Sequence, residues 1–236
     1  MGSERIRTIT AESLEEARSA ISRGDLIVVP TDTVYGVACD PFNSEAIDRL
    51  FEVKRRPRTK SIQVLFPDLS PLESLGLSLP HPLEVLSATF LPGGFSPICD
   101  AVPASRLATL RHDARPDGSE KLTQGIRVPD FAPLHDILAA LGPLAATSAN
   151  ISGQESATSA QEAYAALGDD VAVYFDAGTT PGPVSSTVVA AAPEKTDGID
   201  ILREGVIPAR VIRAALHADT ARKAGSSTIS SAHADR

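Results

Sequence analysis

The chain has 236 residues, of which 42% are hydrophobic and 22% are charged, the composition of an ordinary globular protein. This length suffices for one domain with a substantial core. The formal net charge of −8 excludes a protein that coats nucleic acid non-specifically, so any RNA contact is expected to be a local patch.

The first part of the chain alternates helix and strand patterns. A capped helix with one apolar face is predicted over residues 10–23, and the apolar run that follows predicts a buried strand over residues 25–30. A second helix is expected over residues 43–54, and a second strand over residues 61–66. Between the first strand and the second helix, Tyr35 and Gly36 are interpreted as packing and turn residues.

The middle of the chain is less regular. Residues 83–90 are typical of a helix, residues 91–94 contain the turn sequence Leu-Pro-Gly-Gly, and residues 96–101 are expected to be extended. The polar stretch over residues 104–123 is predicted to be a loop.

Two further strands are expected on either side of a helix over residues 133–141. The strands lie at residues 125–128 and 144–147. The second of these brings Ser148 and Asn150 to its carboxyl end.

The last elements include a helix that opens at residues 158–161, in the form of a capping box, and ends at Gly168. A final helix is expected after Pro208. Strands are predicted at residues 171–175, 186–191 and 199–202. Some neighbouring strands have no helix between them, so the pattern predicts an α/β domain with a mixed sheet. We expect a single domain over residues 1–216 and a disordered tail over residues 217–236.

The sequence favours no metal centre built from cysteine or histidine. Cys39 and Cys99 are far apart and are predicted to be buried thiols, and the five histidines have no metal-binding spacing. No apolar run is long enough for a membrane span, and no secretory pattern is recognised at the start. A cytoplasmic location is therefore expected.

Two short stretches carry most of the functional information. Residues 54–60 contain five cations, which suits a polyphosphate ligand. Residues 147–153, Thr-Ser-Ala-Asn-Ile-Ser-Gly, place hydroxyl and amide groups on a predicted turn. Neither of the common glycine-rich phosphate motifs, GxxxxGK[ST] or GxGxxG, is present.

Seven motifs occur in the order found in the YrdC/Sua5 family, and the chain resembles that family over residues 8–213. The motifs are Pro30-Thr31-Asp32-Thr33-Val34-Tyr35-Gly36, Lys54-x-Arg56 with Lys60, Leu91-Pro92-Gly93, Ile126-Arg127-Val128-Pro129, Thr147-Ser148-Ala149-Asn150-x-Ser152-Gly153, Ser186-Thr187-Val188-Val189 and Leu202-Arg203-Glu204-Gly205. The resemblance implies a YrdC-like twisted mixed sheet flanked by helices, with a large concave, positively lined cavity. It implies one catalytic domain, without the extra carboxyl-terminal domain of longer members.

The resemblance also implies an activity, that of an L-threonylcarbamoyladenylate synthase, a nucleotidyltransferase. Such an enzyme makes threonylcarbamoyl-AMP and pyrophosphate from L-threonine, bicarbonate and ATP. Its product serves the modification of tRNA to N6-threonylcarbamoyladenosine at position 37, through separate transferase machinery. Mg²⁺ is expected with ATP and no protein-built metal site is expected, Asp32 being only a weak candidate. Direct tRNA contact stays open.

By resemblance, the basic stretch supplies the catalytic residues. Lys54 and Arg56 are expected to bind phosphates, and Lys60 to neutralise the carbamoyl or pyrophosphate side. The alternative is a solvated basic helix end that complements the helix dipole. Arg55 and Arg58 are expected to be exposed, with possible contact to tRNA.

Threonine or carbamate binding is assigned by resemblance to Thr31, Thr33, Arg127 and Ser148. A turn capped by its own side chains is the alternative for the two threonines. Arg127 stands between two apolar strand residues, which predicts that it points to the opposite face, toward a cavity.

Nucleotide binding is assigned by resemblance to Lys54, Arg56, Ser148, Asn150, Ser186 and Arg203. An ordinary Asx or Ser turn also explains Ser148 and Asn150, and an ion pair with Glu204 also explains Arg203.

The chain departs from the family pattern at Ser61, where proline is usual, and at Pro97. Both changes leave open a paralogue that forms a different carbamoyl adenylate, as related domains in carbamoyltransferases do. A non-catalytic module that binds structured RNA is a third reading, and overall acidity weighs against it.

Overall fold

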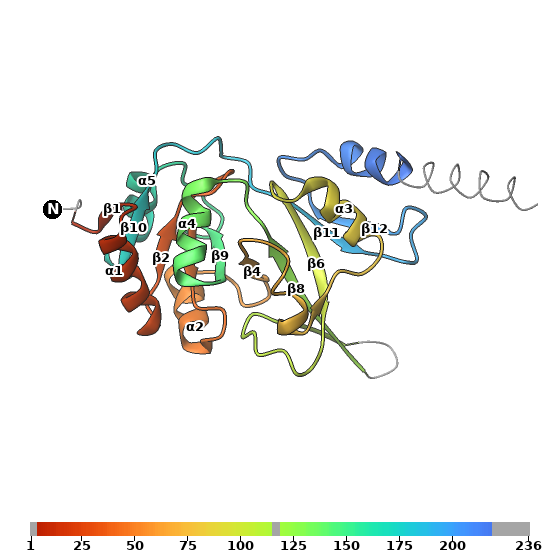
Figure 1. Cartoon of the computed structure of the whole chain (residues 1–236), viewed down its shortest axis with the longest axis horizontal. Helices are drawn as coiled ribbons and strands as arrows, with labels where there is room; N and C mark the ends of the chain where they lie inside the picture. The colour runs from red at the N-terminus through yellow and green to blue at the C-terminus, as the bar shows by residue number, and fades with distance from the viewer. Residues whose placement is uncertain (1–3, 115–118, 219–236) are drawn as a thin grey trace, which may run out of the picture.

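The computed structural model describes residues 4–114 and 119–218, which form a layered α/β structure around one twisted sheet (Figure 1). One half of the sheet has the strand order β1 (Ile6–Thr8), β10 (Val173–Asp176), β2 (Ile27–Val29), β3 (Gly36–Cys39), β9 (Leu144–Ser148) and β4 (Gln63–Leu65). The order continues through β8 (Glu120–Arg127), β6 (Phe95–Ala101), β11 (Thr187–Ala191) and β12 (Ile199–Arg203). The short strands β5 (Leu77–Ser78) and β7 (Arg111–Ala114) pair with β6 and β8.

The sheet is mixed, as the sequence predicted. Strands β1, β10 and β2 run parallel, whereas β3 and β9 pair antiparallel with each other and with their outer neighbours β2 and β4. Parallel pairing returns between β4 and β8 and between β6 and β11. The predicted fold class, a twisted mixed sheet flanked by helices, is confirmed.

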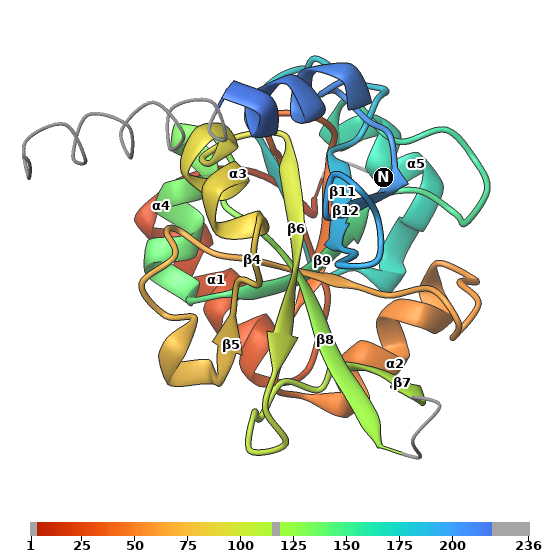
Figure 2. The same cartoon turned by 90° about the vertical axis from the view of Figure 1, so that its right-hand side faces the viewer.

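Two pairs of helices cover opposite faces of the first half of the sheet (Figures 1 and 2). Helices α1 (Ala11–Ser22) and α4 (Ala132–Leu141) pack on one face, and α2 (Ser44–Val53) and α5 (Ala160–Leu167) on the other. Each helix buries its apolar stripe against the strands, so that one hydrophobic cluster lies on each face of the sheet. The central strands are buried on both faces, which explains their continuous apolar sequence.

Local capping sets where these helices begin and end. Thr10 and Ser13 form a reciprocal capping box at the start of α1, and the Asn43 side chain caps α2. Helix α2 ends at Lys54, after which Arg55 adopts a left-handed conformation with φ of 50°. The Arg56 amide then donates to the carbonyl oxygen of Phe51, as in a Schellman motif.

The second half of the sheet carries helix α3 (Leu83–Phe90) and a helix over residues 209–218 (Figures 1 and 2). Leu83, Leu86 and Ile212 from these helices pack with Phe95 and Val189 of the strands. Both helices lie where the sequence predicted them. Residues 219–236, which make up most of the predicted tail, lie outside the described residues.

The prediction of a loop over residues 104–123 holds for residues 104–110 and is wrong for residues 111–114 and 120–123, which are strands. Strand β7 and the first half of β8 form an antiparallel hairpin in this stretch, with Arg111 paired to Thr123 and Ala114 to Glu120. The side chains of Arg111 and His112 are exposed, so the strand lacks the apolar alternation by which strands are recognised in sequence.

Gly36 is a strand residue, and its interpretation as a turn residue is wrong. It opens β3, where a Cβ would lie 3.4 Å from the carbonyl oxygen of Thr147 on β9. Strand β3 was not predicted, and neither were the short strands β1 and β5. Tyr35 is a fully buried packing residue, as predicted.

Cys39 and Cys99 are buried free thiols, as predicted. Burial raises the pKa of both, with smaller contributions from Asp40 and Asp100, which keeps them protonated and unreactive near neutral pH. Within the described ranges, the helices are too short or too polar to cross a membrane.

Candidate functional site

A pocket lies where the two halves of the sheet meet, bordered by β3, β9 and β4 on one side and by β8, β6, β11 and β12 on the other. Its empty volume is about 740 Å³, counting space that is open to solvent. The polar and charged side chains in its lining are Thr31, Arg56, Ser61, Gln63, Ser96, Arg127, Thr147, Ser148, Ser185, Ser186 and Arg203. Seven segments that are separate in the sequence thus contribute to one site.

The lining includes three arginines, Arg56, Arg127 and Arg203, and no carboxylate among its described residues. Burial lowers the pKa of all three guanidinium groups. Arg203 lowers the pKa of Arg56 further, and Arg127 lowers that of Arg203, because like charges face one another. An anionic ligand would relieve this repulsion, so the pocket is suited to phosphate or carboxylate groups.

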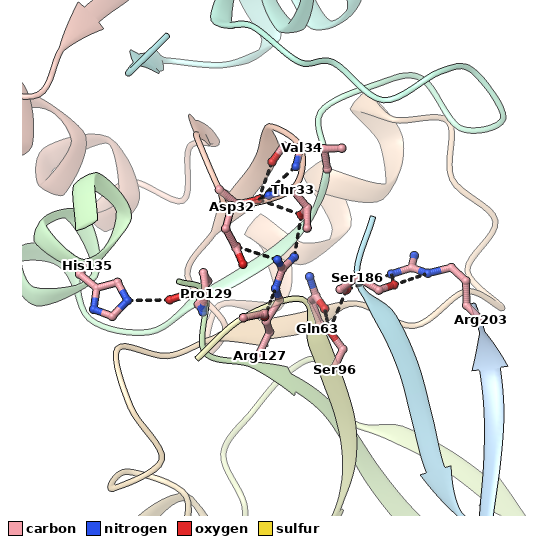
Figure 3. Close-up of polar contacts among 12 residues, drawn as sticks. Asp32, Thr33, Val34, Gln63, Ser96, Arg127, Pro129, His135, Ser186 and Arg203 are labelled. Carbon is pink, nitrogen blue, oxygen red and sulfur yellow. Dashed lines mark hydrogen bonds and ion pairs between the residues drawn. The ribbon is translucent and has the colours of Figure 1, made fainter. Parts of the chain in front are cut away.

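Arg127 is almost fully buried and connects three segments (Figure 3). Its Nη2 donates to Asp32 Oδ1 at 2.6 Å, its Nη1 to Thr33 Oγ1 at 2.9 Å and its Nε to the carbonyl oxygen of Gly93 at 3.0 Å. The ion pair with Asp32 opposes the effect of burial on its pKa. The side chain reaches the pocket, as the sequence predicted, and also fixes the residue 31–34 turn beside it.

The two threonines of this turn have different surroundings. Thr31 lines the pocket, but its Oγ1 accepts hydrogen bonds from the amides of Thr33 and Val34 and donates to the Val34 carbonyl oxygen. This is the self-capped turn that the sequence left as an alternative. Thr33 is buried behind the lining, and its hydroxyl contacts Thr31 and Arg127.

The Lys54 ammonium lies outside the pocket lining and is 1% exposed. Its Nζ donates to the carbonyl oxygens of Ser148 and, at 2.6 Å, Asn150. The Lys54 carbonyl oxygen in turn accepts from the Ser152 amide at 2.8 Å. We call these three contacts the Lys54 clamp, since they tie the end of α2 to the turn that follows β9.

Asn150 also faces the protein rather than the pocket. Its Nδ2 donates to the carbonyl oxygens of Ile151 and Gln154, both at 2.8 Å, so its side chain closes an internal turn. Ser148, at the end of β9, does line the pocket. The structure therefore brings Ser148 to the ligand space and places Asn150 behind it.

The other cations of the basic stretch point in different directions. Arg56 lines the pocket, with Nη2 donating to the Ser61 carbonyl oxygen and with a buried Nε that has no partner among the described residues. Lys60 is exposed and lines a neighbouring hollow beneath the β7–β8 hairpin. Arg55 and Arg58 are exposed, as predicted, and Arg58 pairs with Asp48.

Ser186 and Arg203 meet at the far wall of the pocket (Figure 3). Arg203 donates to the Ser186 carbonyl oxygen from Nη2 at 2.9 Å and from Nε at 3.2 Å, and Nη2 also donates to Ser186 Oγ at 3.2 Å. No ion pair joins Arg203 to Glu204 in the described part of the chain. The Ser186 hydroxyl contacts Ser96, which contacts Gln63.

Sequence reasoning did not assign Ser61, Gln63, Ser96, Thr147 or Ser185 to the site. Ser61 and Ser96 lie in segments where the chain departs from the family pattern. This departure was the only sequence feature that distinguished the two residues. Gln63 begins strand β4 and is followed by apolar residues. Nothing in this pattern indicated that its side chain faces a pocket.

No group of three potential metal ligands occurs among the described residues. Asp32, the weak candidate for Mg²⁺, is paired with Arg127. The described residues of this site therefore do not form a carboxylate cage.

The family model named for Sua5, YciO and YrdC, described as "Telomere recombination", matches residues 19–205. A putative threonylcarbamoyl-AMP synthase from Mycobacterium tuberculosis is 34% identical over 214 residues, which cover 89% of this chain and 92% of that protein. The threonylcarbamoyl-AMP synthase of Bacillus subtilis is 31% identical over 211 residues, covering 86% of this chain and 56% of the relative.

Solved structures show the same fold. The crystal structure of P. abyssi Sua5 complexed with L-threonine matches with a TM-score of 0.75 and 26% identity, covering 89% of this chain and 59% of that one. This chain thus spans about three fifths of that protein. E. coli YciO matches with a TM-score of 0.69 over 88% of this chain and 96% of its own, at 23% identity.

Proposed function

The chain is a member of the Sua5/YciO/YrdC family, and we propose that it is a threonylcarbamoyl-AMP synthase. The substrates are L-threonine, bicarbonate and ATP, and the products are threonylcarbamoyl-AMP and pyrophosphate. The adenylate supplies the N6-threonylcarbamoyl group of modified tRNA adenosine. The observation that carries this proposal is the convergence of Arg56, Arg127 and Arg203 on one pocket without an opposing carboxylate in its described lining.

The reaction needs charge neutralisation and alignment more than acid–base chemistry. The threonine amine and bicarbonate give a carbamate with loss of water. A carbamate oxygen then attacks the α-phosphorus of ATP, and the bond to the β-phosphate oxygen breaks as pyrophosphate leaves. Guanidinium groups stabilise the charge on both phosphate fragments, and a fixed pocket holds the two reactants in line.

Each lining group has a proposed role in that alignment. Arg56 and Arg203 bind the phosphates, with Ser148 and Ser186 donating hydroxyls to phosphate or ribose. Arg127 and the turn at Thr31 and Thr33 hold the threonine or carbamate end, and Lys60, from the neighbouring hollow, neutralises charge on the carbamoyl or pyrophosphate side.

Lys54 and Asn150 contribute by a different route from direct phosphate binding. Through the Lys54 clamp, the ammonium fixes the turn after β9, and Asn150 closes that turn from behind. Ser148 is thereby held at the pocket wall. Both residues are proposed as positioning groups for the nucleotide site.

Further features follow from the same proposal. The enzyme is a nucleotidyltransferase that works in the cytoplasm as the catalytic domain formed by residues 1–216. Mg²⁺ accompanies ATP and supplies charge neutralisation on its phosphates. The labile adenylate passes to separate tRNA-modifying machinery. The exposed Arg55 and Arg58 are available for contact with tRNA.

The direct test is pyrophosphate release from ATP and bicarbonate, with L-threonine, with L-serine or with no amino acid, while the adenylate is resolved by chromatography. Threonine-dependent release with a threonylcarbamoyl-AMP peak supports the proposal. Release that needs carbamoyl phosphate and not threonine would assign the chain to a carbamoyl-adenylate-forming paralogue. Salt-sensitive RNA binding without turnover would identify a binding module.

A further inference from the structure

The far wall of the pocket contains a chain of hydrogen bonds whose direction the chemistry of its members determines. Arg203 Nη2 lies 3.2 Å from Ser186 Oγ, Ser186 Oγ lies 2.8 Å from Ser96 Oγ, and Ser96 Oγ lies 2.9 Å from Gln63 Oε1. These four residues come from β12, the segment before β11, β6 and β4. We call them the Arg203–Gln63 relay (Figure 3).

A guanidinium group can only donate, so Ser186 Oγ accepts from Arg203. The Gln63 carboxamide oxygen can only accept, so the single hydroxyl hydrogen of Ser96 points to Gln63. The bond between the two hydroxyls must then be donated by Ser186. Because both serines are almost completely buried, no water competes for these hydrogens, and the relay has one direction.

The same arrangement sets what the carboxamide of Gln63 presents to the pocket. Its oxygen is held by Ser96, so its Nε2 presents two N–H donors, and no described residue accepts from them. Figure 3 shows the carboxamide between Arg127 on one side and Ser186 with Arg203 on the other, and all four residues line the pocket. Arg56 adds a buried Nε without a described partner. The wall therefore offers donors and lacks a matching acceptor.

We propose that Gln63 is a specificity-determining residue whose Nε2 donates to an oxyanion of the substrate, a phosphate oxygen of ATP or the carboxylate of threonine. In the observed orientation the carboxamide shows the ligand a donor, whereas turning it over would reverse the bond between Ser96 and Ser186 and show the ligand an acceptor. Ser96 and Ser186 act as positioning residues. This inference rests on the proposed function and adds a residue to its site.

The test compares Gln63→Met, which removes the donors, with Gln63→Glu, which replaces them by an acceptor. Binding of two probes is measured by calorimetry: an ATP analogue with a methylene bridge between the α- and β-phosphorus atoms, and L-threonine. We expect Gln63→Met to weaken one probe by about 10-fold and Gln63→Glu to weaken the same probe by about 100-fold. The probe that responds identifies the oxyanion.

Two further variants separate the relay from packing and from net charge. Ser96→Ala frees the carboxamide to turn and is expected to weaken the same probe by about threefold. Gln161→Glu adds the same charge on the exposed surface of α5 and should leave both affinities within twofold. Melting temperatures identify any variant that has lost its fold.

The inference is overturned if both Gln63 variants bind both probes within twofold of wild type, or if they weaken binding equally, since equal losses indicate packing alone. These results would leave the synthase activity of the wild type intact. A wild type that binds neither probe and forms no adenylate would instead remove the proposed function, and the inference with it.

Discussion

Replacing Lys54 by methionine should abolish a pH dependence of stability that the wild-type chain possesses. Burial of the ammonium, with repulsion from Arg56 and Lys60, lowers the pKa of Lys54 to about 7. In the unfolded chain a lysine has a pKa of about 10.4. Between these values the unfolded chain binds a proton that the folded chain has released, so the free energy of unfolding rises with pH.

The size of this effect follows from the two pKa values. Each pH unit well between them changes the free energy of unfolding by about 1.4 kcal/mol. Because half of the folded molecules still carry the proton at pH 7, the change between pH 7 and pH 9 is about 2.3 kcal/mol. The carbonyl oxygens of Ser148 and Asn150 stabilise the charged form, so this is an upper value. At pH 6 and below both states are almost fully protonated, and Lys54 contributes little slope.

Urea denaturation at pH 6, 7, 8 and 9 measures the effect, followed by circular dichroism because the chain contains no tryptophan. The difference between wild type and Lys54→Met should change by only about 0.4 kcal/mol from pH 6 to 7 and grow by about 1 kcal/mol or more for each pH unit above it. Lys195→Met is the matched control, since Lys195 is exposed and pairs with Asp200. Parallel curves for wild type and Lys54→Met would refute the reasoning, because they would show that the ammonium keeps an ordinary pKa inside the clamp.

Three further substitutions test the site. Arg127→Lys keeps a charge but cannot reach Asp32, Thr33 and Gly93 together, so urea titration should show a loss of about 2–4 kcal/mol in the free energy of unfolding, together with loss of adenylate formation. Arg203→Met should raise the KM for ATP by about 10- to 100-fold in the pyrophosphate assay, while the melting temperature changes little because the residue lies at the solvent-exposed side of the pocket wall. Arg55→Gly should raise the free energy of unfolding by about 0.5–1 kcal/mol, since glycine adopts the positive φ of this helix end without strain, and a decrease would contradict that account.

Elements whose causes are local could be predicted from the sequence. Helix α1 begins where Thr10 can cap it, and α3 occupies residues 83–90 as its apolar spacing indicated. Strand β3 and the β7–β8 hairpin could not be found in the same way. A glycine opens the first because another backbone approaches it closely, and exposed polar side chains form much of the second. Pairing partners, rather than local periodicity, make these segments strands.

The direction of a side chain is also a non-local property. The sequence identified Lys54 as a cation at a helix end, which is compatible with solvent, phosphate or a carbonyl cluster. The choice depends on where the turn after β9 lies, and that turn is more than 90 residues away. Buried carbonyl oxygens without donors are costly, so once the turn packs against α2 the ammonium is drawn to it.

Strand pairing brings together the cations that give the pocket its positive charge. The cluster of basic residues in the sequence accounts for only one of them. Residues 54–60 hold five cations, yet Arg56 alone among them lines the pocket. Parallel pairing sets Arg127 of β8 beside Leu65 of β4, and Arg203 of β12 lies opposite Val188, which itself pairs with Ser96 of β6. A chain with a net charge of −8 thereby concentrates three guanidinium groups at one point, where a lining without carboxylates leaves their field for an anionic substrate.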